Sequence, residues 1–219
     1  MSKGFIDRAH AGTALGEVLR EHVPETGAVV LALPRGGVVT GFEVARALGV
    51  PLDVLIVRKL GVPGMPELAM GAVARGVRVL NEDVIADTQI AAHQIEEVAK
   101  AELAEVDRRE AAYRRGRPAP ELAGQTVILV DDGIATGSTM LAAIRAVRAH
   151  KPRRLLVAVP VAPHDTCERL RPEVDELICL ATPEPFFAIS MWYDRFPQIS
   201  DAEVKDMLER AQPAGHAAT

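Results

Sequence analysis

Short stretches of mostly apolar residues alternate along the chain with stretches in which apolar residues recur at helical spacing. The short stretches have the length of a strand and are rich in Val, Leu and Ile, which is typical of strands buried on both faces. They lie at 28–33, 52–57, 127–130, 154–159 and 176–180. The helical stretches lie at 5–22, 38–48, 140–147 and 166–170. This alternation predicts an α/β fold with three layers, in which a mostly parallel, twisted sheet is flanked by helices.

The middle of the chain departs from this alternation. Short apolar segments at 69–73 and 77–80 surround Arg75 and Gly76, which predicts a β-hairpin. A long amphipathic pattern over 85–113 follows and predicts one inserted helix. Three roles for this helix stay open: it stabilises the C-terminal part of the fold, pairs with another subunit or joins a mobile loop.

We expect a single domain over residues 1–219. Its core comprises about 24–60 and 126–180, and a flexible loop with the inserted helix occupies about 61–120. A small hood, which holds most of the aromatic residues, occupies about 181–219.

Composition and charge exclude several classes of protein. The formal net charge of −5 and the pI of about 5.7 argue against broad affinity for nucleic acid, which requires a basic face. No apolar run approaches the roughly 20 residues that span a bilayer. The N-terminus lacks the apolar segment of a signal peptide, so we expect a cytoplasmic protein with no membrane partner. The two cysteines, Cys167 and Cys179, lack metal-ligand spacing and are expected to be free thiols.

One segment carries both carboxylates and hydroxyls directly after a predicted strand. Asp131 and Asp132 follow the apolar residues 127–130, and a loop of small residues leads into the next helix. The N–H groups and hydroxyls of that loop, with the N-terminus of the helix, favour a phosphate group. The carboxylates would repel phosphate and instead suit vicinal hydroxyls, a metal or another cation. A ligand that carries both a phosphate and a sugar diol therefore fits this segment.

A glycine-rich turn follows an earlier predicted strand. Arg35, Gly36 and Gly37 come directly after the strand at 28–33 and before a helix. The glycines permit unusual backbone conformations and a close approach to a ligand. The guanidinium of Arg35 suits phosphate oxygens. The turn repeats the strand–loop–helix arrangement and predicts a second edge of the same site.

Residues 131–139 resemble the phosphoribosyl-pyrophosphate (PRPP) motif of the type I phosphoribosyltransferases in residue order, spacing and context. The resemblance implies that Asp131 and Asp132 hold the ribose 2′- and 3′-hydroxyls. It also implies that the loop holds the 5′-phosphate, through Ala135, Thr136, Gly137, Ser138 and Thr139. The alternative is a structural strand end with two solvated aspartates, which is disfavoured because adjacent like charges cost stability without a ligand.

The resemblance extends to the pyrophosphate side of the site. It implies pyrophosphate binding by Arg35, Gly36, Gly37, Arg58 and Lys59. Lys59, which follows the predicted strand at 52–57, is preferred over Arg58 and joins Asp131 and Asp132 as an implied catalytic residue. A solvated strand terminus explains the two basic residues equally well.

The resemblance also bears on the acceptor. A hood near the C-terminus of the family covers the nucleobase, and Trp192 and Phe187 are the candidates to stack on it. A core or dimer role for these aromatics is equally open. Enzymes for 6-oxopurines place an Asp where this chain has Ala135, which argues against hypoxanthine and guanine and leaves the acceptor open.

The implied activity is the transfer of a phosphoribosyl group from Mg·PRPP to a nucleobase or similar nitrogen acceptor, with release of pyrophosphate. Mg²⁺ is the implied cofactor, held by PRPP oxygens and, among protein groups, by Asp131 or Asp132 at most. The implied partners are PRPP and the acceptor, and a homodimer stays open. The alternative is a PRPP- or nucleotide-binding regulatory protein of the same fold without catalysis. A PRPP synthetase would need a longer, duplicated architecture.

Overall fold

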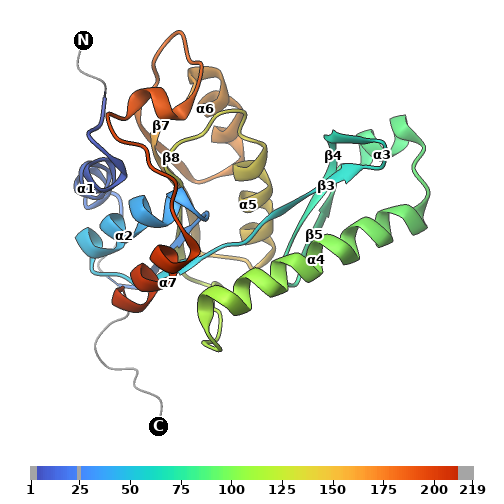
Figure 1. Ribbon diagram of the computed structural model, residues 1–219, viewed down its shortest axis with the longest axis horizontal. Coiled ribbons are helices and arrows are strands. Elements are labelled where there is room, and N and C mark those ends of the chain that lie inside the picture. The colour runs from blue at the N-terminus through green and yellow to red at the C-terminus, as the bar shows by residue number, and fades with distance from the viewer. Residues whose placement is uncertain (1–3, 24–25, 212–219) are drawn as a thin grey trace.

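Five parallel strands form the central sheet, in the order β2-β1-β6-β7-β8 (Figure 1). The strands are β1 (Ala28–Ala32), β2 (Leu52–Val54), β6 (Thr126–Val130), β7 (Arg154–Val161) and β8 (Glu176–Ala181). The computed structural model describes residues 4–23 and 26–211. Every residue of β1 and β6 is buried, which explains why these strands are continuous apolar runs rather than alternating ones.

Helices cover both faces of this sheet and complete three layers. One face carries α1 (Arg8–Leu19), α2 (Gly36–Leu48) and α7 (Asp201–Arg210), and the other carries α5 (Ser138–Ala149) and α6 (His164–Leu170). Successive side chains of a strand point to opposite faces. Val30 of β1 therefore packs in the same cluster as Val44 of α2, whereas its neighbour Leu31 packs in the cluster of Ile144 of α5. The predicted α/β fold is confirmed, and we call this part of the molecule the body.

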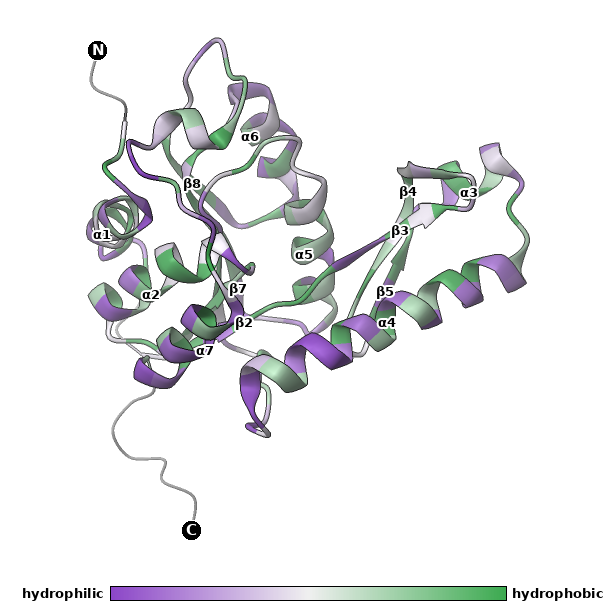
Figure 2. Ribbon diagram, viewed as in Figure 1, coloured by the Kyte–Doolittle hydropathy of each residue, from purple (hydrophilic) through white to green (hydrophobic). Residues whose placement is uncertain are grey.

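A second structure, the arm, projects from the body (Figure 1). It consists of β3 (Arg58–Val62), β4 (Met65–Ala74), β5 (Val77–Leu80), α3 (Glu82–Thr88) and α4 (Ala92–Arg114). The strands form an antiparallel sheet in the order β3-β4-β5. The predicted hairpin is confirmed: Arg75 and Gly76 join β4 to β5, and Gly76 has a positive φ of 71°. In Figure 2, α4 alternates between hydrophobic and hydrophilic residues, and its apolar side packs on the sheet of the arm through residues such as Val106.

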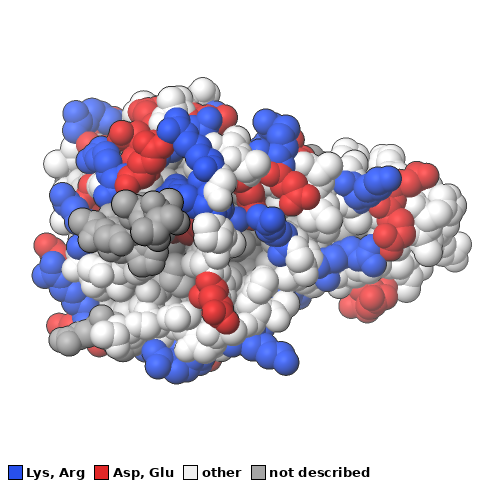
Figure 3. Space-filling view, turned by 90° about the horizontal axis from the view of Figure 1, so that it is seen from below, with Lys and Arg blue, Asp and Glu red and all other residues white. Residues whose placement is uncertain are grey.

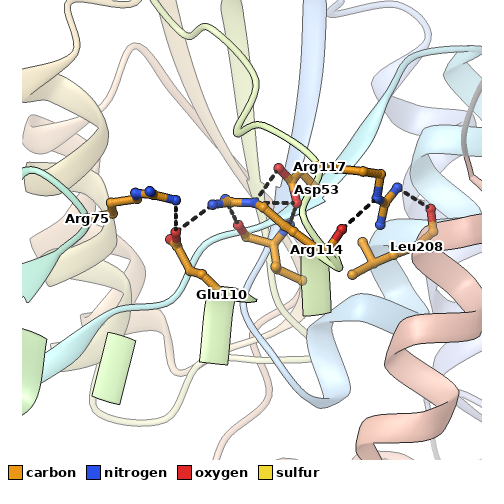
Figure 4. A network of polar contacts seen from close by, with 7 residues as sticks. Asp53, Arg75, Glu110, Arg114, Arg117 and Leu208 are labelled. Atoms are coloured by element: carbon orange, nitrogen blue, oxygen red, sulfur yellow. Dashed lines mark hydrogen bonds and ion pairs between the residues drawn. The ribbon is translucent and has the colours of Figure 1, made fainter. Parts of the chain in front are cut away.

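A buried ion network ties α4 to the body (Figure 4). Arg114 donates from Nε to Asp53 Oδ2 at 2.9 Å, from Nη1 to Glu110 Oε2 at 2.6 Å and from Nη2 to the Val54 carbonyl at 3.0 Å. Arg114 is 6% exposed and Glu110 2% exposed. Arg75 reaches Glu110 from the arm at 3.4 Å. The end of α4 is therefore fixed to the edge strand β2 by charge as well as by apolar packing.

Two boundaries predicted from the sequence are wrong. The single helix expected over 85–113 is interrupted, because Gln89 adopts a left-handed conformation with φ 51° and ends α3 before α4 begins at Ala92. The strand expected over 52–57 ends at Val54. Arg58 and Lys59 instead open β3, because the chain leaves the parallel sheet there to pair with β4 of the arm.

The C-terminal segment returns to the body. It contains β8, preceded by a 3₁₀ turn (Arg171–Glu173), then a second 3₁₀ turn (Ile189–Trp192), and finally α7. Tyr193 bridges to Phe5, and α7 packs in the helix layer with α2. Residues 212–219 of the expected hood, 24–25 of the expected core and 1–3 lie outside the described residues. The expected hood role therefore stays a prediction. In the described part of the chain, no helix combines the length and apolar character needed to cross a membrane.

Candidate functional site

The two predicted loops meet because their strands are neighbours. Strands β1 and β6 are parallel and in register, with Ala32 opposite Val130, and the Leu33 N–H donates to the Val130 carbonyl at 2.9 Å. The carboxyl ends of parallel strands lie at one edge of the sheet, where ligands of α/β proteins bind. The turn that contains Arg35, Gly36 and Gly37 therefore lies beside Asp131 and Asp132.

This contact is too close for side chains on the glycine turn. A Cβ on Gly36 would lie 1.9 Å from Asp132 Oδ2, and a Cβ on Gly37 would lie 2.8 Å from Asp131 Oδ1. The peptide between Pro34 and Arg35 is cis. The sequence predicted these glycines for a close approach to a ligand. In the structure they permit a close approach to the aspartate pair.

Asp132 is buried, and its carboxylate is paired with an arginine. It is 8% exposed. Its Oδ2 accepts a hydrogen bond from Arg8 Nε at 2.6 Å, and its carbonyl accepts one from the Tyr193 hydroxyl at 2.5 Å. The Asp132 carboxylate is thus one half of a buried ion pair.

Asp131 has a different environment. The residue as a whole is partly exposed, and its Oδ1 accepts from the Asp132 backbone N–H at 2.8 Å. Desolvation, with the adjacent charge of Asp132, raises the pKa of Asp131 well above its ordinary value. Donors such as sugar hydroxyls, or a cation, would stabilise the charged form. Asp131 is thus less buried than Asp132, and its carboxylate accepts from a backbone N–H rather than from a guanidinium.

The predicted phosphate loop forms the start of α5. Gly137 is left-handed, with φ 79°, and no side chain caps this helix N-terminus. The loop is held from behind by α6: Thr166 Oγ1 donates to the Ala135 carbonyl at 3.0 Å, and Arg169 donates to the Thr136 carbonyl at 3.1 Å. Exposed side chains line the outer surface of the loop, namely Ala135, Thr136, Ser138 and Thr139. N–H groups at a helix N-terminus and exposed hydroxyls form a suitable anion site.

The basic residues predicted for pyrophosphate do not share one position. Arg35 lies at the sheet edge, half exposed, with Nη1 3.9 Å from Asp201 Oδ1 of α7. Arg58 belongs to the arm and donates to Glu102 of α4 at 2.7 Å. Lys59, the next residue of β3, is exposed and pairs in register with Ala72 of β4. The structure therefore brings together Arg35 and the aspartates, while Arg58 and Lys59 lie on the arm.

The aromatic residues predicted for base stacking lie in different surroundings. Trp192 is partly buried and packs beside Phe5 and Tyr193. Phe187 is 75% exposed on the loop after β8. A cavity of about 680 Å³ adjoins this loop and is lined by Pro163, His164, Asp165, Pro183, Glu184, Pro185 and Phe186. It lies where the chain leaves β7 and β8, at the same edge of the sheet.

Sequence reasoning missed the residues that hold the site from outside it. The helical stretch predicted over 5–22 contains Arg8, but the pattern indicates no role at the site for it, nor for Tyr193, Thr166 or Arg169. One signal was present for Arg8: with Ala11 and Leu15 it lies on the buried face of α1. A charged residue on the apolar face of a helix calls for a buried partner.

Comparisons with known proteins agree with this geometry. A family model described as "Phosphoribosyl transferase domain" matches residues 7–194. Two proteins from Mycobacterium tuberculosis, of strains CDC 1551 / Oshkosh and ATCC 25618 / H37Rv, carry the name "Putative phosphoribosyl transferase". Each is 48% identical over 210 residues, a match that covers 95% of this chain and 47% of the relative. The chain thus spans about half the length of these curated relatives.

A solved structure is also similar over nearly the whole chain. The crystal structure of TT1426 from Thermus thermophilus has a TM-score of 0.87 and 41% sequence identity. The similarity covers 97% of this chain and 100% of that one. The match therefore includes the arm, because it leaves only a few per cent of this chain uncovered.

Proposed function

The chain belongs to the phosphoribosyl transferase domain family, and from this premise we propose that it transfers the phosphoribosyl group of Mg·PRPP to a nitrogenous acceptor and releases pyrophosphate. The proposal rests on one observation: residues 131–139 combine a carboxylate with a separate group of N–H and hydroxyl donors. The partly exposed residue Asp131 lies on the same short segment as a helix N-terminus without a side-chain cap and with exposed Thr and Ser residues. A phosphorylated sugar carries the matching groups within one molecule: a diol that suits the carboxylate, and a 5′-phosphate that suits the N–H and hydroxyl donors.

Each part of the site has a role in this reaction. Asp131 accepts from the ribose hydroxyls, and residues 135–139 donate to the 5′-phosphate. Arg35 and the amides of Gly36 and Gly37 stabilise the departing pyrophosphate. The bond from ribose C1 to pyrophosphate breaks with its electron pair on the leaving oxygen, and the acceptor nitrogen supplies the pair for the new bond and then loses its proton. The protein acts by positioning and by electrostatic stabilisation of the charge that separates at C1.

Mg²⁺ fits this site. Magnesium binds through one or two carboxylates together with substrate phosphates, and the partly exposed Asp131 offers such a carboxylate, whereas Asp132 Oδ2 is engaged by Arg8. When bound, Mg²⁺ would neutralise charge on the pyrophosphate oxygens.

The arm and the C-terminal loop complete the proposal. Lys59, with Arg58 beside it, would reach pyrophosphate from the arm, and closure of the arm would exclude water from the reacting centre. The acceptor would enter through the cavity beside Phe186, with Phe187 or Trp192 as the stacking residue. Ala135 offers no carboxylate to a base nitrogen, so we expect poor turnover of hypoxanthine and guanine.

Calorimetric titration with Mg·PRPP tests the binding step. We expect the wild type to bind and Asp131→Asn to bind at least about tenfold more weakly, because a hydrogen bond to a charged group is lost. Asp87→Asn, an exposed aspartate on α3, is the matched control and should bind as the wild type does. Equal affinity of the wild type and Asp131→Asn for Mg·PRPP would overturn the assignment of this carboxylate.

A pyrophosphate-release assay over adenine, hypoxanthine, guanine, xanthine, uracil and orotate tests catalysis. Turnover of any base supports the transferase, and clear turnover of hypoxanthine contradicts the argument from Ala135. Binding of PRPP without turnover would favour the regulatory alternative. A regulator that bound nucleic acid would need a basic face, and on the face shown in Figure 3 acidic and basic side chains are interspersed over body and arm.

A further inference from the structure

A buried arginine outside the predicted motif contacts the acidic pair. Arg8, on α1, is 7% exposed. Its Nε lies 2.6 Å from Asp132 Oδ2, and its Nη1 donates to the Pro197 carbonyl at 2.7 Å. Its guanidinium carbon lies 3.6 Å from the centre of the Phe196 ring. Polar contacts and an aromatic face thus enclose this guanidinium, which fixes its position.

Arg8 changes the charge of the site. Two adjacent carboxylates alone would carry two negative charges beside a polyanionic substrate. The guanidinium neutralises one of them, and the group of Arg8, Asp131 and Asp132 then carries a single negative charge. The remaining charge resides on Asp131, which is the partly exposed member.

Arg8 also joins segments that are far apart in the sequence. It lies 124 residues from Asp132 and 189 residues from Pro197. The start of α1 is paired with the same C-terminal segment through the Phe5 N–H to the Trp192 carbonyl and the Asp194 N–H to the Phe5 carbonyl, each at 2.9 Å. The segment that crosses the sheet edge is therefore anchored on Arg8 as well as on backbone hydrogen bonds.

We propose that Arg8 is a positioning residue of the phosphoribosyl site: it holds Asp132 as an internal, charged anchor and leaves Asp131 as the carboxylate that contacts the ribose hydroxyls. This inference rests on the proposed function. It separates the roles of two residues that the motif alone treats as equal.

Groups from several elements surround the Asp132 carboxylate. These are Asp131 on its own loop, Arg8 from α1 and the Tyr193 hydroxyl from the C-terminal segment, and the backbone of Gly36 covers the carboxylate. Arg8 is the one cation that contacts the Asp132 carboxylate in the described part of the chain. Without Arg8, the two neighbouring negative charges would be uncompensated and would repel each other.

The test compares Arg8→Met and Arg8→Lys with a matched control. Arg195→Met is the control, because Arg195 also joins the two segments, through Asp7 Oδ2 at 2.7 Å, but is exposed and does not contact the aspartate pair. We expect Arg8→Met to weaken Mg·PRPP binding by about tenfold or more. Arg8→Lys should recover part of the affinity, and Arg195→Met should leave the affinity unchanged.

A second readout needs no substrate. A double-mutant cycle of Arg8→Met and Asp132→Asn on the free energy of unfolding of the free protein should show coupling, because each substitution removes the same ion pair. Additive effects in this cycle, or in the cycle with Arg8→Lys if Arg8→Met does not fold, overturn the inference. If the wild type fails to bind PRPP, the proposed function fails, while coupling in the cycle still supports the ion-pair role of Arg8.

Discussion

The residue at position 36 has to be a glycine because its neighbours leave no room for a side chain. Its φ is not in the left-handed region, yet an added Cβ would lie 1.9 Å from Asp132 Oδ2 and 2.8 Å from Arg8 Nε. The Asp132 side chain is short, buried and bonded to Arg8, so it cannot move aside without breaking that ion pair. The glycine turn, the aspartate pair and α1 therefore form one packed unit.

Gly36→Ala should destabilise the protein by about 1–3 kcal/mol, the usual cost of overpacking, and should abolish tight PRPP binding. Chemical denaturation and calorimetry measure the two effects. Gly4→Ala is the control, since a Cβ there would meet only the Trp192 carbonyl, at 3.6 Å. A Gly36→Ala variant as stable as Gly4→Ala would show that the aspartate pair adjusts freely.

Asp131 should lower the stability of the ligand-free protein. Burial and the Asp132 charge raise its pKa in the folded state above the ordinary 3.8. The folded state then binds the proton more tightly than the unfolded state, so the contribution of Asp131 to stability is lost as pH rises through the raised pKa. Asp131→Asn should therefore unfold at a higher temperature than the wild type at pH 7, with a difference that disappears as the pH falls to about 4.

Thermal unfolding of both proteins between pH 4 and pH 8 measures this dependence. Asp87→Asn, exposed on α3, should follow the wild type throughout. A wild type that gains stability over Asp131→Asn as pH rises would contradict the raised pKa. The expected stabilisation of Asp131→Asn, together with its loss of PRPP binding, is the trade-off found where a site is strained for function.

At the scale of elements, α4 depends on buried charge. Arg114 satisfies both Asp53 and Glu110 (Figure 4), and burial raises the pKa of each of these carboxyls. A buried carboxylate that loses its partner strongly lowers the free energy of unfolding, whereas an exposed ion pair contributes about 1 kcal/mol or less to it. The junction between body and arm should therefore be sensitive to one side chain.

Arg114→Met should reduce the free energy of unfolding by about 3–5 kcal/mol. Denaturant titration measures the loss. The loss should be larger at pH 8 than at pH 5, because Asp53 and Glu110 take up protons at the lower pH and no longer bury charge. The neighbouring Arg115→Met, which removes an exposed pair with Glu209, is the control and should cost about 1 kcal/mol or less. Equal losses for Arg114→Met and Arg115→Met would contradict the conclusion that the ion pairs of Arg114 are buried.

At the scale of the whole molecule, body and arm differ in how completely they are buried. All of β6 is buried, whereas no residue of β5 and none of α3 is fully buried. Regions with few buried contacts open at lower free energy than the core. Within the arm, β5 and α3 should therefore open more readily than β6 of the body.

Hydrogen exchange should show this difference. Amides of β6 should exchange only through global unfolding, and amides of β5 and α3 should exchange through smaller openings at much lower free energy. Arg114→Met should accelerate exchange in the arm more than in β6, and Arg115→Met should not. Uniform protection of β5 and β6 in the wild type would show that body and arm unfold together.

The sequence by itself determined the features that depend on neighbouring residues. The buried strands, the hairpin at Gly76 and the carboxylate and hydroxyl segment at 131–139 follow from local periodicity and turn chemistry, which act over a few residues. The interruption at Gln89 escaped prediction, because the amphipathic pattern continues on both sides of a single left-handed residue.

Only the tertiary structure decided which charges meet. Arg58 pairs with Glu102 in the arm, and Arg8 pairs with Asp132 across 124 residues. Nothing local distinguishes Asp131 from Asp132, since both follow the same strand. The difference arises because α1, the glycine turn and the C-terminal segment pack on one carboxylate and leave the other partly exposed. Burial and partner choice are properties of the packed molecule, and they set the chemistry of the site.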